Sequence, residues 1–226
     1  SPVPVGTNFS VSASVAAGPY GNIAGNVKVY DGSTTGTLLV TCALPGNTAP
    51  PASPASCSAP TNTLAPGSHT IVGVFESSSA NYANSATATA TGGIVIEAVS
   101  TTLTLTAPAA VTVGGSISLP YSITPSSVGA ISGTVKIYEG TSTSGGTFIA
   151  DCAITAASGS CSLPTVSGGT VVIAPGSHSY VARFVSTAAN YANSGDSTAV
   201  SATVNQAAAV SLTTPTVTPS TFAVNA

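Results

Sequence analysis

Charged side chains are scarce in this chain of 226 residues. Asp, Glu, Lys and Arg make up only 4% of the residues, and the basic ones are Lys28, Lys136 and Arg183. Nucleic-acid binding requires many basic side chains that neutralise phosphates, so we expect no nucleic acid as a partner. Catalysis requires acids, bases or nucleophiles that converge on one place. Six carboxylates and two histidines spread along the chain do not provide this, and the sequence predicts no enzyme activity, no catalytic residue and no cofactor.

The chain also lacks Met, Trp and long apolar runs. No stretch approaches the roughly 18 to 20 apolar residues that a membrane helix needs, so we expect no membrane-spanning segment. Helix-favouring Glu, Lys and Arg are rare, whereas Val, Thr and Ile occur in short runs between Gly and Pro, which is typical of strands. Disordered chains combine low hydrophobicity with high net charge, but here 43% of residues are hydrophobic and the net charge is -3. The sequence therefore predicts a folded, all-β protein.

Most of the chain is present twice. The repeated segments are 27–32 (VKVYDG) and 135–140 (VKIYEG), 66–69 and 175–178 (both PGSH), and 80–85 and 189–194 (both ANYANS). Solenoid units repeat at roughly 20 to 50 residues, so a period of this length indicates whole domains, each large enough to bury a core. We predict domains at 1–98 and 99–206, with 207–226 as the start of a further one.

Each copy contains several short segments that are typical of strands. In the first copy, residues 9–15 alternate apolar and hydroxyl side chains, the period of a strand with one buried face. That face would carry Phe9, Val11, Ala13 and Val15. The segments 69–75 and 178–184 show the same alternation after a Pro-Gly turn. About seven strands per copy, separated by turn residues, predict a sandwich of two sheets.

Each copy also contains two cysteines, Cys42 with Cys57 and Cys152 with Cys161. A structural metal site needs four ligands, and neither copy offers a C-x-x-C pair or clustered histidines, so we expect no metal. One disulfide within each copy is the better interpretation. Disulfides that close loops of this size would stabilise each domain by roughly 2.5 to 3 kcal/mol. Disulfides also indicate an oxidising, extracellular compartment.

The order of the repeated motifs resembles a known family. The strand Gly-x-Val-x-Val/Ile-Tyr-Asp/Glu-Gly is followed by Pro-Gly-Ser-His and then by Asn-Tyr-Ala-Asn-Ser. This order is similar to that of the bacterial Ig-like repeat, which occurs in tandem in large surface proteins and adhesins, and the similarity covers nearly all of both copies. It implies tandem immunoglobulin-like β-sandwiches joined end to end, on the cell surface. The chain lacks the core Trp of antibody domains. Its cysteine pairs are expected to be of a hairpin type, which differs from the inter-sheet disulfide of antibody domains.

The remaining polar and aromatic residues have structural interpretations. His69 and His178 each stand alone at the start of a strand, so we expect structural imidazoles. Asp31 and Glu139 share one turn position and are expected to accept hydrogen bonds from the local backbone. A sugar-binding module would show exposed aromatic side chains. The candidates for such exposed rings are Tyr20, Tyr30, Tyr121 and Tyr138.

Two features of the chain concern its continuation. The second copy opens with a strand at 101–106 that the first copy lacks, and a similar segment occurs at 210–214. Either one chain donates this strand to the next, or the sequence is a window on a longer tandem array. We favour the window, because 221–226 resembles 8–13.

The segment 97–102 contains no Pro/Gly-rich linker, so the domains should form a semi-rigid rod.

The predicted function is that of a structural repeat in an extracellular surface protein. It would act as a stalk, a spacer or a building block of a fibre or sheath, with neighbouring copies of itself as partners, end to end or laterally. The hydroxyl-rich, nearly uncharged surface would carry glycans or pack against such copies. The alternative is a carbohydrate-binding or adhesive recognition module.

Overall fold

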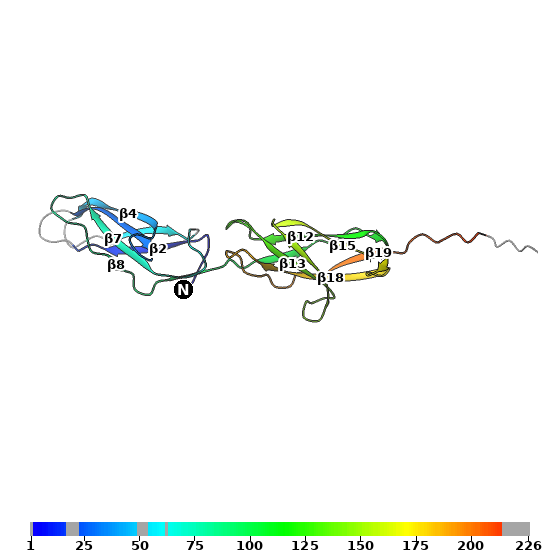
Figure 1. Cartoon of the computed structure of the whole chain (residues 1–226). Coiled ribbons are helices and arrows are strands. Elements are labelled where there is room, and N and C mark those ends of the chain that lie inside the picture. The colour runs from blue at the N-terminus through cyan, green and yellow to red at the C-terminus, as the bar shows by residue number, and fades with distance from the viewer. Residues whose placement is uncertain (1, 17–22, 49–53, 62, 214–226) are drawn as a thin grey trace, which may run out of the picture.

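The computed structural model describes residues 2–16, 23–48, 54–61 and 63–213, and all regular elements in these residues are strands. They build two β-sandwiches that lie end to end (Figure 1). The first contains β1 to β9 and the second β10 to β19. No helix in the described residues is long and apolar enough to cross a membrane. The predicted all-β fold class, with tandem sandwiches, is confirmed.

The second sandwich has two facing sheets. One has the strand order β10 (Thr102–Leu105), β12 (Ser116–Thr124) and β15 (Ser158–Pro164), all antiparallel. The other has the order β11 (Val111–Thr112), β19 (Val200–Asn205), β18 (Gly176–Ser186), β13 (Gly133–Glu139) and β14 (Thr147–Ile154). Only the short β11 pairs with its neighbour in a parallel manner. A small hairpin adds β16 (Val166–Ser167) and β17 (Thr170–Val171).

The first sandwich repeats this plan with differences. Its smaller sheet contains β2 (Asn8–Ser14) and β5 (Pro54–Pro60). The opposite side contains β4 (Thr37–Thr48), β3 (Ile23–Asp31), β7 (Ile71–Ser77) and β8 (Ala88–Thr89) in that order, and beside them β1 (Val3–Pro4), β9 (Ile94–Glu97) and β6 (Gly67–His69). The single long strand β18 is thus represented by β6 and β7, which are interrupted at Thr70.

Each sandwich has its own hydrophobic core. Val27 and Val29 of β3 are buried, and so are Val135 and Ile137 of β13. The alternation predicted for 9–15 is present in β2, but its apolar side chains are only partly buried. The equivalent side chains of β12, which lie 108 positions later, are almost completely buried. They are Ile117, Leu119, Tyr121 and Ile123, with exposures of 0%, 0%, 8% and 1%.

The glycine that opens the repeated strand motif has a steric reason. Gly133 of β13 has a φ of 156°, and a Cβ atom there would collide with the carbonyl oxygen of Val185 and lie 2.6 Å from the ring of Phe184. A Cβ atom at Gly25 in the first sandwich would likewise collide with the carbonyl oxygen of Glu76 and with the ring of Phe75. Only glycine lets this strand lie so close to the phenylalanine of the neighbouring strand.

Candidate functional site

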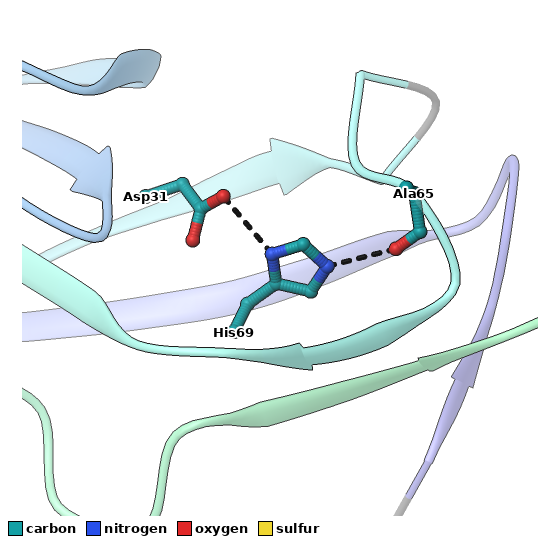
Figure 2. A network of polar contacts seen from close by, with 3 residues as sticks. All are labelled: Asp31, Ala65 and His69. Carbon is teal, nitrogen blue, oxygen red and sulfur yellow. Dashed lines mark hydrogen bonds and ion pairs between the residues drawn. The ribbon is translucent and has the colours of Figure 1, made fainter.

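The polar contacts that recur in both sandwiches are centred on the histidines. Nδ1 of His69 lies 2.9 Å from Oδ2 of Asp31, and Nε2 lies 2.8 Å from the carbonyl oxygen of Ala65 (Figure 2). In the second sandwich, His178 makes the same two contacts, at 2.6 Å to Glu139 and 2.7 Å to the Ala174 carbonyl. A carboxylate and a carbonyl can only accept hydrogen bonds, so a ring that bonds to both must donate from both nitrogens. The geometry therefore fits the imidazolium form.

The surroundings of both histidines favour this charged form. Burial lowers the pKa of His69, but the Ala65 carbonyl and the Asp31 carboxylate outweigh it, and the pKa is raised above its usual value. The hydrogen bond that His178 donates to the Glu139 carboxylate is the largest influence on the pKa of His178, which is also raised. Each ring connects the turn before a strand to the end of the neighbouring strand. The arrangement supports a structural role for both side chains.

The structure corrects part of the expectation for these residues. Asp31 and Glu139 were expected to accept from the local backbone, but the structure pairs their carboxylates with the histidines. The signal was present in the sequence, because the acid and the histidine recur together at nearly the same offset. Within the part of the chain that the structure describes, no three His, Cys, Asp or Glu side chains are grouped so that they could hold a metal ion.

The disulfide of the second sandwich joins its two sheets. The sulfur atoms of Cys152 and Cys161 are bonded, and the two Cα atoms are 5.8 Å apart. Cys152 lies in β14 and Cys161 in β15, so the bond connects consecutive strands of different sheets. The expectation of a hairpin-type pair that does not join the two sheets was therefore wrong for this disulfide. Cys42 is also disulfide-bonded. The side chain of Cys57 lies outside the described residues, and the pairing of Cys42 with Cys57 stays a prediction.

The aromatic residues proposed as an exposed sugar-binding surface do not all lie at the surface. Tyr121 is only 8% exposed, because it faces the core from β12. Tyr30 and Tyr138 are half-buried, and Tyr20 lies outside the described residues. Sequence reasoning missed Phe148, whose side chain is 50% exposed and packs edge-on against Tyr138 with the ring centroids 5.5 Å apart.

The connection between the sandwiches is a hydrogen-bonded segment. The Val99 amide donates to the Asn190 carbonyl, and the Val99 carbonyl accepts from the Ala192 amide, both at 2.9 Å. Val99 and Tyr191 thereby form a parallel β-bridge. The hydroxyl of Thr101 donates to the Ala192 carbonyl at 2.8 Å. The repeated Asn-Tyr-Ala motif thus fixes the segment by which the second sandwich is entered.

The same motif positions a loop that reaches the first sandwich. Nδ2 of Asn190 donates to the Val128 carbonyl at 2.8 Å, and the Val128 amide donates to the Tyr191 hydroxyl at 3.1 Å. That hydroxyl donates to the carbonyl of Gly129 at 2.9 Å. The side chain of Val128 packs against the cores of both sandwiches. Gly6 faces it closely, since a Cβ atom there would lie 2.5 Å from Cγ1 of Val128.

We call the group Gly6, Val99, Val128, Asn190 and Tyr191 the joint. Gly6 has a φ of 87°, which favours glycine, and its missing side chain makes room for Val128. The hydrogen bonds of the Val99 amide and carbonyl restrict the motion of the connecting segment, whereas a Gly/Ser linker would be flexible. The joint brings together segments that are far apart in the sequence.

No family model and no curated protein matches the chain. Among solved structures, CBD12 from CALX1.2 matches with a TM-score of 0.31 and 11% identity, covering 88% of this chain and 93% of that one. A DUF3823 family protein from Bacteroides ovatus ATCC 8483 matches with a TM-score of 0.30 and 11% identity, covering 87% and 99%. The likeness does not extend to function, and the resemblance to bacterial Ig-like repeats stays a prediction.

Proposed function

We propose that this chain is a non-enzymatic structural repeat of an extracellular surface protein, in which the two sandwiches act as a stiff spacer of a stalk or fibre. The observation that carries the proposal is the joint. Val128 packs against both cores, and Val99 is hydrogen-bonded through both its amide and its carbonyl. A spacer transmits length and direction only if its units do not swivel, and this arrangement opposes swivelling.

The surface chemistry supports the same role. Lys28 pairs with Glu76 at 2.7 Å, and Lys136 pairs with Asp151 at 2.9 Å, so two of the three basic side chains are neutralised locally. The remaining surface relies on hydroxyl groups, which oppose association poorly. Such a surface suits close packing against other copies or a cover of glycans. The disulfide between β14 and β15 supports an extracellular, oxidising location.

Small-angle X-ray scattering of the monomeric chain tests this function. We expect one extended shape whose length equals two sandwiches end to end. The matched control carries a Gly/Ser insertion after Glu97, which should behave as a flexible coil and give a broad distribution of shapes. If the unmodified chain scatters like the control, the units swivel freely and the spacer function is refuted.

A carbohydrate-binding role is the second candidate, and one observation favours it. Phe148 presents a half-exposed ring, and Nζ of Lys136 lies 5.7 Å from the centre of that ring. Exposed rings next to polar groups are the usual means of stacking on sugars. A glycan array decides this candidate. Binding that is lost in Phe148→Ala and kept in Leu38→Ala, an apolar position in the first sandwich that is 48% exposed, would establish it, and no binding would exclude it.

A further inference from the structure

The second sandwich has an apolar patch on the side where its two sheets are open. Phe148 of β14 and Val172, which follows β17, are 50% and 56% exposed, and both line one cavity of about 250 Å³. The rest of the lining comes from β14, from the end of β15 and from Ile173. β14 and β15 are the last strands of their sheets, and Val171 beside them is 48% exposed. We call Phe148, Val171, Val172 and this cavity the β14 patch.

The shared fold of the two sandwiches does not require this patch. Ten residues separate Pro164 from Pro175, whereas only five separate Pro60 from Pro66 at the corresponding place in the first sandwich. The additional residues include the hairpin of β16 and β17, which leads directly to Val172. Both sandwiches nevertheless make the same histidine contacts just after this segment. The hairpin is therefore an addition to a common framework, and exposed apolar surface of this kind marks contact with a partner.

The β14 patch is held in a fixed position. The carbonyl of Thr165 accepts hydrogen bonds from the amides of Val172 and Ile173, at 2.9 and 3.2 Å. Thr165 itself is completely buried, so the base of the hairpin is anchored in the sandwich. Phe148 packs edge-on against the ring of Tyr138. Because these groups are already ordered, a partner that binds them pays little conformational entropy for the patch.

The backbone of β14 indicates that the partner is a polypeptide. Among the described strands β14 pairs only with β13, so the donors and acceptors of its other edge are open to a further strand. Thr147–Ile154 contains no Lys, Arg or Pro, and Lys and Pro are residues that usually protect such an edge. Its one charged residue, Asp151, lies 2.9 Å from Nζ of Lys136 and is neutralised within the same chain.

The β14 patch is also complementary to itself. In an isologous contact the same surface of two copies meets about a two-fold axis, so a projecting group and a recess that receives it must lie close together. Phe148 and the cavity that it borders satisfy this condition. An unpaired charge near such an axis would face its own copy, and the pairing of Asp151 with Lys136 avoids this repulsion.

We propose that the β14 patch is the interface of a two-fold symmetric pair of chains, in which Phe148 of each copy enters the cavity of the other. An axis perpendicular to β14 makes the two open edges antiparallel, so that their backbone groups can form hydrogen bonds. The apolar centre, with Lys136 and Asp151 beside it, has the usual anatomy of a protein interface. The contact is closed, because each copy uses its patch once.

This inference adds a lateral partner to the proposed spacer function and rests on that function only for its biological purpose. The joint is measured in the monomer at low concentration, whereas pairing is measured as the concentration rises. A flexible joint would refute the spacer and leave the pairing intact. A chain that stays monomeric would refute the pairing and leave the spacer intact.

Sedimentation of the purified chain over a range of concentrations is the first test. We expect monomers and dimers in equilibrium. Phe148→Ala should raise the dissociation constant about 100-fold or more, because the symmetric pair loses the ring twice. The control is Leu38→Ala, which removes a side chain that is 48% exposed at the equivalent position of the first sandwich and should leave the dissociation constant unchanged. A monomeric unmodified chain, or equal effects of the two substitutions, would overturn the proposal.

Mixing two variants tests the two-fold arrangement. Ala150 lines the cavity, so Ala150→Leu should fill it and leave Phe148 in place. Neither this variant nor Phe148→Ala should pair with itself at concentrations where the unmodified chain does. In a mixture, the ring of the first variant can still enter the cavity of the second, and the mixed pair should form about 10-fold more tightly than either variant pairs with itself. A mixture that associates no better than its components contradicts the proposal. So does a monomeric chain that binds glycans through Phe148, which would assign the patch to sugars.

Discussion

Replacing Val128 by Asp should open the joint without unfolding either sandwich. Complete burial of a valine contributes about 1.5 to 3 kcal/mol, and Val128 is partly buried, so loss of its contacts costs about 1 kcal/mol. Keeping a carboxylate against the core of the first sandwich adds a desolvation cost. We therefore expect a loss of about 2 kcal/mol, which raises the open population of the joint roughly 30-fold.

The loop that carries Val128 should remain in place in this variant. Its amide and carbonyl bond to Tyr191 and Asn190 through backbone atoms that the substitution does not alter. Scattering curves and the rotational correlation times of the two sandwiches provide the readout. The control Val172→Asp adds the same charge at a position that is 56% exposed. If Val128→Asp tumbles and scatters like the unmodified chain, or if Val172→Asp loosens the chain equally, the role assigned to Val128 is refuted.

Three further predictions concern the second sandwich. Reduction of the Cys152–Cys161 bond, which closes a loop with a sequence separation of 9, should lower the free energy of unfolding by roughly 2.5 kcal/mol in denaturant titrations, and no change would contradict the disulfide's assigned role. Because the pKa of His178 is raised in the folded protein, its contribution to the free energy of unfolding is fully present below about pH 6.5 and is lost as the pH rises through the raised pKa. The substitution His178→Gln should remove that part of the pH dependence of the unfolding midpoint. An unchanged pH profile would contradict the ion pair. Gly133→Ala should lower the free energy of unfolding by more than about 2 kcal/mol, since its Cβ would collide with the carbonyl of Val185. An unchanged unfolding temperature would show that the two neighbouring strands can move apart enough to hold the Cβ.

The sequence predicted those features that depend on local alternation. The alternation at 178–184 predicted a buried face correctly, since Tyr180, Ala182 and Phe184 are all buried, because side chains in a strand alternate between its two faces. It also placed His69 and His178 at equivalent strand starts. It did not predict their carboxylate partners, since Asp31 and His69 come from strands 38 residues apart and meet only through sheet pairing.

The joint was predicted only in outline. The absence of a flexible linker at 97–102 indicated limited freedom, and the structure shows the bridge from Val99 that provides it. Nothing in the sequence distinguished Val128 from other surface valines. Its importance arises from the Asn190 and Tyr191 side chains that hold its loop against Gly6. Contacts of this kind depend on how two folded units meet and leave no periodic pattern in the sequence.

Residual dipolar couplings test the rigidity of the joint most directly. The couplings are measured for backbone amides of both sandwiches in one weakly aligned sample of the monomeric chain. If the joint holds the sandwiches as one body, a single alignment tensor will fit both sets of couplings. Two tensors that differ in magnitude and rhombicity would show that the sandwiches reorient independently, and would contradict the stiff spacer on which the proposed function depends.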